Sequence, residues 1–234
     1  MEELIRAGRV RVDGRMAELG QRVEPARARI TVDGTPVPAD PDLRYFALNK
    51  PAGVTTTMRD PHAERSIAGY LPPGPRIFPV GRLDRESEGL LLLTNDGELS
   101  HRLQHPRYGV EKEYLVEVEG SLSRQTLRTL AAGVKLVDGI ARPRRIGRVD
   151  RVGRRSALTL VMGEGRKREV RRMLEAVGHR VLRLVRVRIG PVRLSNLREG
   201  QSRPLSPGEI AELYGAVGLE HASRSSPRPR RAEG

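Results

Sequence analysis

The chain has 234 residues, enough for one substantial hydrophobic core and one small additional module. It carries 43 Lys and Arg against 29 Asp and Glu, a net charge of +14, with the arginines spread along its length, so the expected partner is a polyanion. The absence of Cys excludes disulfides, thiol catalysis and thiolate metal sites.

Patterns associated with membranes, cofactors and metals are missing from the sequence. No apolar run approaches the roughly 20 residues of a membrane-spanning helix, and no signal-peptide pattern opens the chain, so we expect a cytoplasmic protein without a membrane partner. Glycine-rich phosphate loops are absent and the five His show no paired ligand spacing, so we expect no cofactor and no metal. Aromatic residues make up 3% of the chain, which leaves few side chains to stack on bases.

Residues 1–42 are expected to form a small basic module and a linker. A short helix over residues 2–7 precedes two strand patterns that turn at Asp13-Gly14 and Asp33-Gly34. This segment resembles the second half of the RNA-binding domain first known in ribosomal protein S-four, without that domain's first helix. The resemblance implies phosphate contacts by Arg6, Arg9, Arg11 and Arg15. The alternative is an inert basic hairpin, and prolines from position 36 to 41 predict a domain boundary near residue 42.

The next segment carries one carboxylate, Asp84, between two arginines. A strand is expected over residues 44–49 and a short helix over residues 65–71. After Asp84, four leucines between Gly89 and Thr94 predict a strand that is buried on both faces and closed by a turn. A rigid strand would then hold the Asp84 loop, which is a common way to mount a catalytic group. On spacing alone, the more common role for such an Asp is to form an Asx turn or to cap a helical turn.

The run from Gly81 to Gly97 reads Gly-Arg-Leu-Asp, a spacer, and Gly-Leu-Leu-Leu-Leu-Thr-Asn-Asp-Gly. It resembles, nearly residue for residue, the active-site motif of the RsuA/RluB-type ribosomal RNA pseudouridine synthases. The resemblance implies that Asp84 is the nucleophile and that Arg82 enters the space vacated by a flipped nucleotide or contacts phosphate. Lys50 begins a Lys-Pro-Ala-Gly-Val turn that resembles the opening of the same catalytic domain and is assigned to RNA binding.

A strand over residues 111–119 follows a helix over residues 98–104. Its period-two alternation places Tyr114, Val116 and Val118 on one inward face. Tyr114 matches the tyrosine that stacks on the target base in the family, although a lone inward Tyr is more often a core residue. Ser123 is expected to cap a helix through residue 132, and a hairpin turns at residues 138–139.

The last third of the chain predicts a strand over residues 157–161, a helix over 166–177 and a strand over 181–189. In the second strand, alternation sets Val185, Val187 and Ile189 opposite Arg186 and Arg188, as expected for an edge or half-buried strand with a basic face. A capping box at residues 206–209 starts a last helix to about residue 214. The tail over residues 219–234 is expected to be disordered.

The helix over residues 166–177 resembles the family's third motif, in which Arg171 supplies a guanidinium paired with Asp84. Such an arginine within about 4–6 Å would keep a buried carboxylate ionised. The other cations of this helix are expected to bind phosphate or to be solvated: Arg166, Lys167, Arg168 and Arg172. Leu184 is expected to floor the pocket.

The resemblance spans residues 2 to about 218 and implies an α+β pseudouridine synthase fold over residues 43–218. That fold is a largely antiparallel mixed β-sheet flanked by helices, with a basic central cleft. The expected function is isomerisation of uridine to pseudouridine in ribosomal RNA by a monomer, and residues 85–89 and 111–114 favour the large subunit. Two alternatives remain: a noncatalytic ribosomal RNA-binding or assembly factor, and a metal-dependent phosphodiesterase using Asp84 and Asp96.

Overall fold

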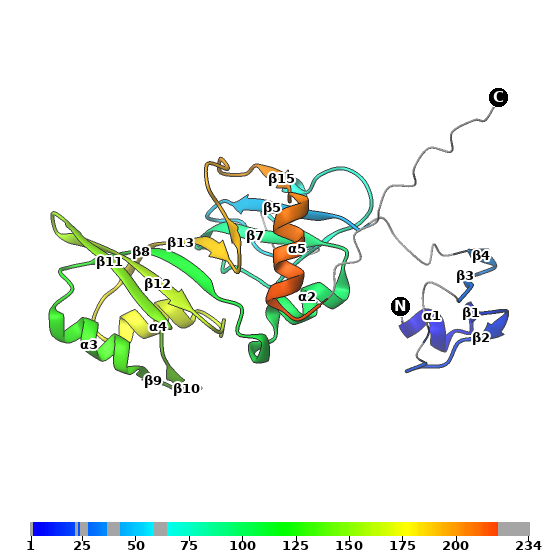
Figure 1. The fold of residues 1–234 in the computed structure, drawn as a ribbon, viewed down its shortest axis with the longest axis horizontal. Helices are drawn as coiled ribbons and strands as arrows, with labels where there is room; N and C mark the ends of the chain where they lie inside the picture. Colours follow the sequence, from blue (N-terminus) through cyan, green and yellow to red (C-terminus); the bar gives the residue numbers. More distant parts are fainter. Residues whose placement is uncertain (1, 22, 24–27, 37–42, 59–64, 220–234) are drawn as a thin grey trace, which may run out of the picture. The chain divides into compact units, whose positions relative to one another are not determined.

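The computed structural model describes residues 2–21, 23, 28–36, 43–58 and 65–219 (Figure 1). The chain divides into two compact units, Met1–Leu43 and Arg44–Gly234, and each is described by itself. The division falls one residue after the boundary expected at residue 42. The expected linker residues 37–42 and tail residues 220–234 lie outside the described residues.

The described residues of the first unit form a small four-stranded sheet and one helix. Helix α1 (Glu2–Arg6) precedes an antiparallel sheet in the order β2-β1-β3-β4. Its strands are β1 (Val10–Val12), β2 (Arg15–Met16), β3 (Ile30–Val32) and β4 (Thr35–Pro36). Both hairpins turn through an Asp with a positive φ followed by Gly, at Asp13 (φ 51°) and Asp33 (φ 50°), the turn chemistry that two-residue hairpins require. The expected short helix and paired turns are therefore confirmed.

The second unit is built on a nine-stranded sheet in the order β11-β12-β8-β13-β7-β5-β15, with β14 beside β13 and β6 beside β7. The strands are β5 (Tyr45–Lys50), β6 (Phe78–Pro79), β7 (Glu88–Thr94), β8 (Lys112–Glu119), β11 (Arg145–Val152), β12 (Arg155–Met162), β13 (Val181–Ile189), β14 (Val192–Arg193) and β15 (Ser202–Pro204). The pair β13 and β7 is parallel and the other neighbouring pairs of this sheet are antiparallel. The expected mixed, largely antiparallel sheet is confirmed.

Helices and one hairpin flank this sheet (Figure 1). They are η1 (Ile67–Tyr70), α2 (Gly97–Gln104), η2 (Pro106–Tyr108), α3 (Arg124–Ala132), the hairpin of β9 (Val134–Leu136) and β10 (Gly139–Ala141), α4 (Glu169–Ala176) and α5 (Pro207–Ala216). Ser123 caps α3 and Ser206 forms a complete capping box with Glu209 at α5, as expected. No helix in the described part of the chain is long and apolar enough to cross a membrane.

Strand β7 is the buried centre of the second unit. Its four leucines are at most 2% exposed, which confirms the prediction of a strand buried on both faces. Leu90 and Leu92 pack in one core cluster with residues of α2 and α5, whereas Leu91 and Leu93 pack in a second cluster on the other face. A continuous apolar run is needed here because neither face meets water.

Strand β13 spans the predicted residues but differs in part from its prediction. It lies between β8 and β7 in the middle of the sheet, so the expectation of an edge strand is wrong, whereas its mixture of buried and exposed residues fits the half-buried alternative. Register shifts between Val181 and Arg183 and between Arg186 and Arg188 interrupt the alternation on which that prediction rested. As a result, Arg186 is buried at 3% exposure.

Candidate active site

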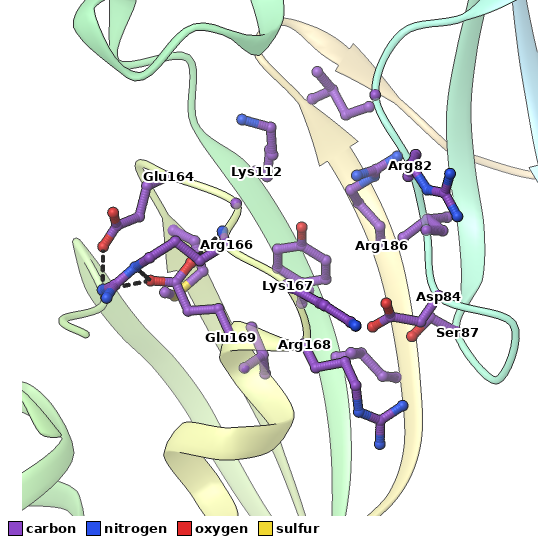
Figure 2. A pocket seen from close by; sticks show the side chains of 18 of the residues that line it. Arg82, Asp84, Ser87, Lys112, Glu164, Arg166, Lys167, Arg168, Glu169 and Arg186 are labelled. Carbon is purple, nitrogen blue, oxygen red and sulfur yellow. Dashed lines mark hydrogen bonds and ion pairs between the residues drawn. The ribbon is translucent and has the colours of Figure 1, made fainter. Parts of the chain in front are cut away.

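A cavity of about 590 Å³ lies beside β8 and β13 (Figure 2). The Asp84 loop forms one wall and the loop before α4 forms another. Six cationic side chains line it: Arg82, Lys112, Arg166, Lys167, Arg168 and Arg186. Three carboxylates accompany them, those of Asp84, Glu164 and Glu169, so the cavity is basic and large enough to take a nucleotide-sized ligand.

The backbone on both sides of Asp84 is fixed. Thr56 Oγ1 donates to the Leu83 carbonyl at 2.7 Å and accepts from the Leu83 N–H at 3.2 Å. On the other side, the Ser87 N–H donates to the Asp84 carbonyl at 3.0 Å and closes a tight turn into β7. The Asp84 side chain itself is partly exposed and lines the cavity. Thr56, which the sequence reasoning did not select, therefore helps to hold this loop.

Lys50 lies under the same loop and not on an RNA-accessible surface. Its side chain is fully buried, and its ammonium donates to the carbonyls of Pro51 at 2.8 Å and Val54 at 2.7 Å. A longer contact of 3.4 Å reaches the Arg85 carbonyl. Burial lowers the pKa of Lys50 to about 8. The assignment of Lys50 to RNA binding needs correction, because in this structure the side chain has no exposed surface with which to meet RNA.

Tyr114 occupies the inward position expected for it. It is 8% exposed, lines the cavity and pairs across the sheet with Leu160 on β12 and Arg186 on β13. Directly opposed residues on neighbouring strands lie on the same face of the sheet, so Arg186 is adjacent to Tyr114 on that face. Leu184, expected to floor the pocket, also lines the cavity and is 5% exposed.

Arg171 is buried behind the Asp84 loop at 6% exposure. Its guanidinium donates to the backbone carbonyls of Val181 at 3.3 Å and Glu86 at 3.2 Å. Among the described residues these carbonyls, and not the Asp84 carboxylate, are its hydrogen-bond partners, so the expected direct pair is not formed in this structure. Burial lowers the pKa of Arg171, and the Glu86 and Asp84 carboxylates oppose that effect, so the Asp84 charge is close enough to act on it.

Two cations of the third motif are tied into a network with acidic residues. Arg166 contacts the carboxylates of Glu164 at 2.8 Å and Glu169 at 3.0 Å. Arg172 donates to both oxygens of Asp138 at 2.9 Å, which connects α4 to the hairpin of β9 and β10. Phosphate binding by these two arginines stays a prediction, and it would compete with these ion pairs.

The other two cations of that motif lie nearer Asp84. Arg168 forms an ion pair with Glu86, and its backbone adopts a left-handed conformation with φ 51°, so α4 begins at Glu169 and not at the predicted residue 166. Lys167 is exposed and extends into the cavity toward Asp84 (Figure 2). Lys167 is thus the cation of this motif that is best placed to meet a ligand.

Three further titratable residues line the cavity and were not predicted as site residues from the sequence. Arg186 donates through Nε to the Leu90 carbonyl at 2.8 Å, while its buried Nη2 has no hydrogen-bond partner among the described residues. Burial and the nearby Arg186 cation lower the pKa of Lys112 to about 8. Burial and the neighbouring Glu164 raise the pKa of Glu169 to about 7. An arginine inside a largely apolar strand was the available signal for Arg186, because burying a charge requires compensation.

Comparison with known proteins decides the family. Residues 44–176, more than half of the chain, match the family model described as RNA pseudouridylate synthase. The chain belongs to this family. A crystal structure of a pseudouridylate synthase superposes with a TM-score of 0.67 at 29% identity, covering 90% of this chain and 91% of that one.

Relatives of this synthase include an uncharacterized RNA pseudouridine synthase of Aquifex aeolicus, 45% identical over 95% of this chain and 90% of that protein. The ribosomal large subunit pseudouridine synthase B of Bacillus subtilis is 38% identical over 91% of this chain and 88% of that protein. The protein of the same name from Vibrio cholerae is 44% identical over 83% of this chain and 62% of that protein.

The metal-dependent phosphodiesterase alternative requires Asp96 as a second carboxylate beside Asp84. In the structure, Asp96 lies instead at the start of α2. Its carboxylate accepts from the Leu99 N–H at 3.0 Å, capping α2, and from the hydroxyls of Tyr45 at 3.0 Å and Tyr214. It is 8% exposed and is not among the residues that line the cavity with Asp84. Asp84 and Asp96 therefore do not share a site, so the geometry does not support the metal-dependent phosphodiesterase hypothesis.

Proposed function

We propose that this member of the family converts specific uridines of large-subunit ribosomal RNA to pseudouridine. Two relatives with 38% and 44% identity carry the name ribosomal large subunit pseudouridine synthase B, and this similarity carries the choice of the large subunit. The motif residues 85–89 and 111–114 favour the same subgroup.

The reaction exchanges one bond for another within a single nucleotide. The bond between the sugar C1′ and the base N1 breaks, the base turns, and a new bond forms from C1′ to the base C5. The proton displaced from C5 leaves to solvent while N1 regains a proton, so substrate and product are isomers and no cofactor is consumed. The site must supply an ionised carboxylate for the sugar or base, a flat wall for the base, and space in which the base can turn.

We assign these tasks to the residues of the cavity. Asp84 is the nucleophile, because it is a partly exposed carboxylate on a rigid loop in a cavity that carries an excess of cations. Tyr114 provides the flat wall. Arg171 fixes the Asp84 loop through the Glu86 carbonyl and adds a positive charge behind it.

Two exposed cations of the cavity lining complete the assignment: Arg82 is proposed to contact the RNA near the flipped nucleotide, and Lys167 to contact a phosphate. The first unit is proposed to be an RNA-binding module of the S-four kind. There, Arg11 and Arg15 are exposed, whereas Arg9 is paired with Asp33. One chain supplies every group assigned above, so we propose that the enzyme acts as a monomer, in the cytoplasm where ribosomal RNA is processed.

A transcript of large-subunit ribosomal RNA made without modifications tests this function. It is incubated with the purified protein, and pseudouridines are mapped by carbodiimide treatment and primer extension. We expect one or a few enzyme-dependent stops in this transcript and none in a small-subunit transcript. Stops in the small subunit alone would contradict the subunit assignment. RNA binding without any stop would favour the noncatalytic binding or assembly factor.

A further inference from the structure

An unusual concentration of charge lies outside the lining of the cavity, on residues 142–155. This segment holds seven arginines and one acidic residue, a net +6 within a chain whose total is +14. The arginines are Arg142, Arg144, Arg145, Arg148, Arg151, Arg154 and Arg155, and all of them are exposed. We call this set the arginine edge, because it borders β11, the outermost strand of the nine-stranded sheet (Figure 1).

The local fold directs these side chains outward. A register shift between Ile146 and Val149 in the pairing of β11 with β12 lets both apolar residues pack against the core cluster around Tyr114. The arginines between and beside them are left to solvent along the free edge. From Arg145 to Arg151 the strand extends roughly 20 Å, at about 3.3 Å per residue.

Internal ion pairs neutralise little of this charge. Arg148 pairs with Asp150, but its side chain remains 83% exposed, and Arg155 pairs with Glu117 while remaining 60% exposed. Exposed pairs of this kind contribute little to stability and are readily exchanged for other partners. One or two charges would be enough to keep an edge strand from pairing with another chain. Seven arginines exceed that requirement.

The arginine edge starts at the rim of the cavity. Arg144 lies over Gly163, where an added Cβ would be 2.6 Å from Arg144 Nε, and Gly163 opens the loop that lines the cavity. Ile146, next to Arg145, is paired with Leu160, which in turn is paired with Tyr114. Two strand spacings of about 4.8 Å therefore separate this end of the edge from the tyrosine row, roughly 10 Å.

We propose that the arginine edge binds the RNA that flanks the target nucleotide, as a second contact surface outside the cavity. A small anion would meet only one or two of these arginines, so a row roughly 20 Å long requires an extended polyanion. Resting on the proposed function, the polyanion is the substrate RNA itself, which passes from the cavity over Arg144 and Arg145 onto β11. The arginine edge thus acts in RNA capture and not in the chemical step.

The test compares two triple variants. Arg145→Gln/Arg148→Gln/Arg151→Gln removes three charges from the arginine edge. Arg76→Gln/Arg193→Gln/Arg198→Gln removes three exposed arginines from segments around β6, β14 and β15, so the net charge is matched. Filter binding to a large-subunit ribosomal RNA transcript is measured over a KCl series. The edge variant should lower the slope of log K against log salt by about 2, and the matched control should leave it nearly unchanged.

Activity separates capture from chemistry. With RNA labelled by tritium at uridine C5, the edge variant should raise KM at least fivefold and leave kcat within twofold. The triple Arg→Lys variant at the same three positions should restore the slope, which a folding defect would not allow. Equal slopes for the edge and control variants, or a fall in kcat with unchanged binding, would overturn the proposal. The binding measurement needs no turnover, so it stands even if the proposed isomerisation fails.

Discussion

Single residues set the electrostatics around Asp84. Arg171 reaches two backbone carbonyls, one on β13 and one in the Asp84 loop, with a buried planar guanidinium. Arg168 pairs with the side chain of Glu86 at the surface, where 37% of the arginine and 61% of the glutamate side chain are exposed. These two arginines of one motif therefore offer a matched comparison between a buried, two-sided contact and an exposed ion pair.

Replacing Arg171 with Lys should reduce kcat at least tenfold, which corresponds to about 1.4 kcal/mol of transition-state stabilisation. A single ammonium cannot bridge both carbonyls and is more strongly hydrated than a guanidinium, so the Asp84 loop loses its support. RNA affinity should barely change. Tritium release and filter binding measure the two effects.

The control is Arg168→Lys, which keeps the charge and can still pair with Glu86. Its rate should stay near that of the unaltered enzyme. Equal rates for the two lysine variants would mean that the geometry of the Arg171 guanidinium has no part in catalysis, and that its charge alone matters.

The pKa of Lys112 should depend on the charge of its neighbour Arg186, and the protonation of Lys112 should affect the stability of the fold. Its pKa of about 8 lies below the ordinary 10.5, so between these values the unfolded chain binds more protons than the folded one. This group's contribution to the free energy of unfolding therefore rises as pH increases from about 8 to about 10.5. Because the Arg186 cation lowers the pKa of Lys112, Arg186→Met should raise that pKa toward 10.5.

NMR titration of lysine side chains can follow this shift, since the chain contains only four lysines and Lys112→Met identifies the signal. An unchanged titration of Lys112 in Arg186→Met would show that the two cations do not interact across the cavity.

At the scale of elements, the parallel contact between β7 and β13 places the Asp84 loop beside the cavity. Gly89 makes this contact possible. It has φ +100°, and an added Cβ would lie 2.3 Å from the Arg186 carbonyl oxygen. Only a residue without a side chain allows the two backbones to approach so closely.

Gly89→Ala should therefore lower the free energy of unfolding by more than about 2 kcal/mol, from the strained φ together with the backbone overlap. Urea unfolding followed by circular dichroism gives the value. The control, Gly97→Ala, places its Cβ in open space at the start of α2 and should be neutral or slightly stabilising. Comparable losses in both variants would refute the close-packing explanation.

Local signals in the sequence were sufficient to predict many of the helices and strands. The leucine run of β7, the cap at Ser123 and the capping box at Ser206 each depend on neighbouring residues and appear as predicted. The edge alternative for β13 was wrong because strand neighbours and bulges depend on pairing with two distant strands, which a pattern of alternation does not reveal.

The candidate site was predictable to a similar extent. Asp84 and Tyr114 could be found because a motif and a period-two pattern place them, and both line the cavity. The burial of Lys50, the partners of Arg171 and, within the described part of the chain, the lack of a partner for Arg186 Nη2 depend on which segments meet in three dimensions. For these residues the sequence supplied the type of side chain and not its surroundings.

At the scale of the whole molecule, the cations behind the net charge of +14 are distributed over both units that the structure describes. Cations surround the cavity, the arginine edge borders β11, and the first unit exposes Arg11 and Arg15. A basic surface by itself fits a binding factor as well as an enzyme. A partly exposed carboxylate inside the basic cavity is the feature that a pure binding factor does not need, since it competes with phosphate for the same cations.

Asp84→Asn tests this central claim most directly. The amide keeps the size and shape of the side chain and removes its charge and nucleophilicity. Tritium release from C5-labelled uridine in a large-subunit ribosomal RNA transcript should fall to background, while filter binding of the same RNA stays within a few-fold of the unaltered protein. Tritium release at a near-normal rate from Asp84→Asn would contradict the assignment of Asp84 as the catalytic nucleophile.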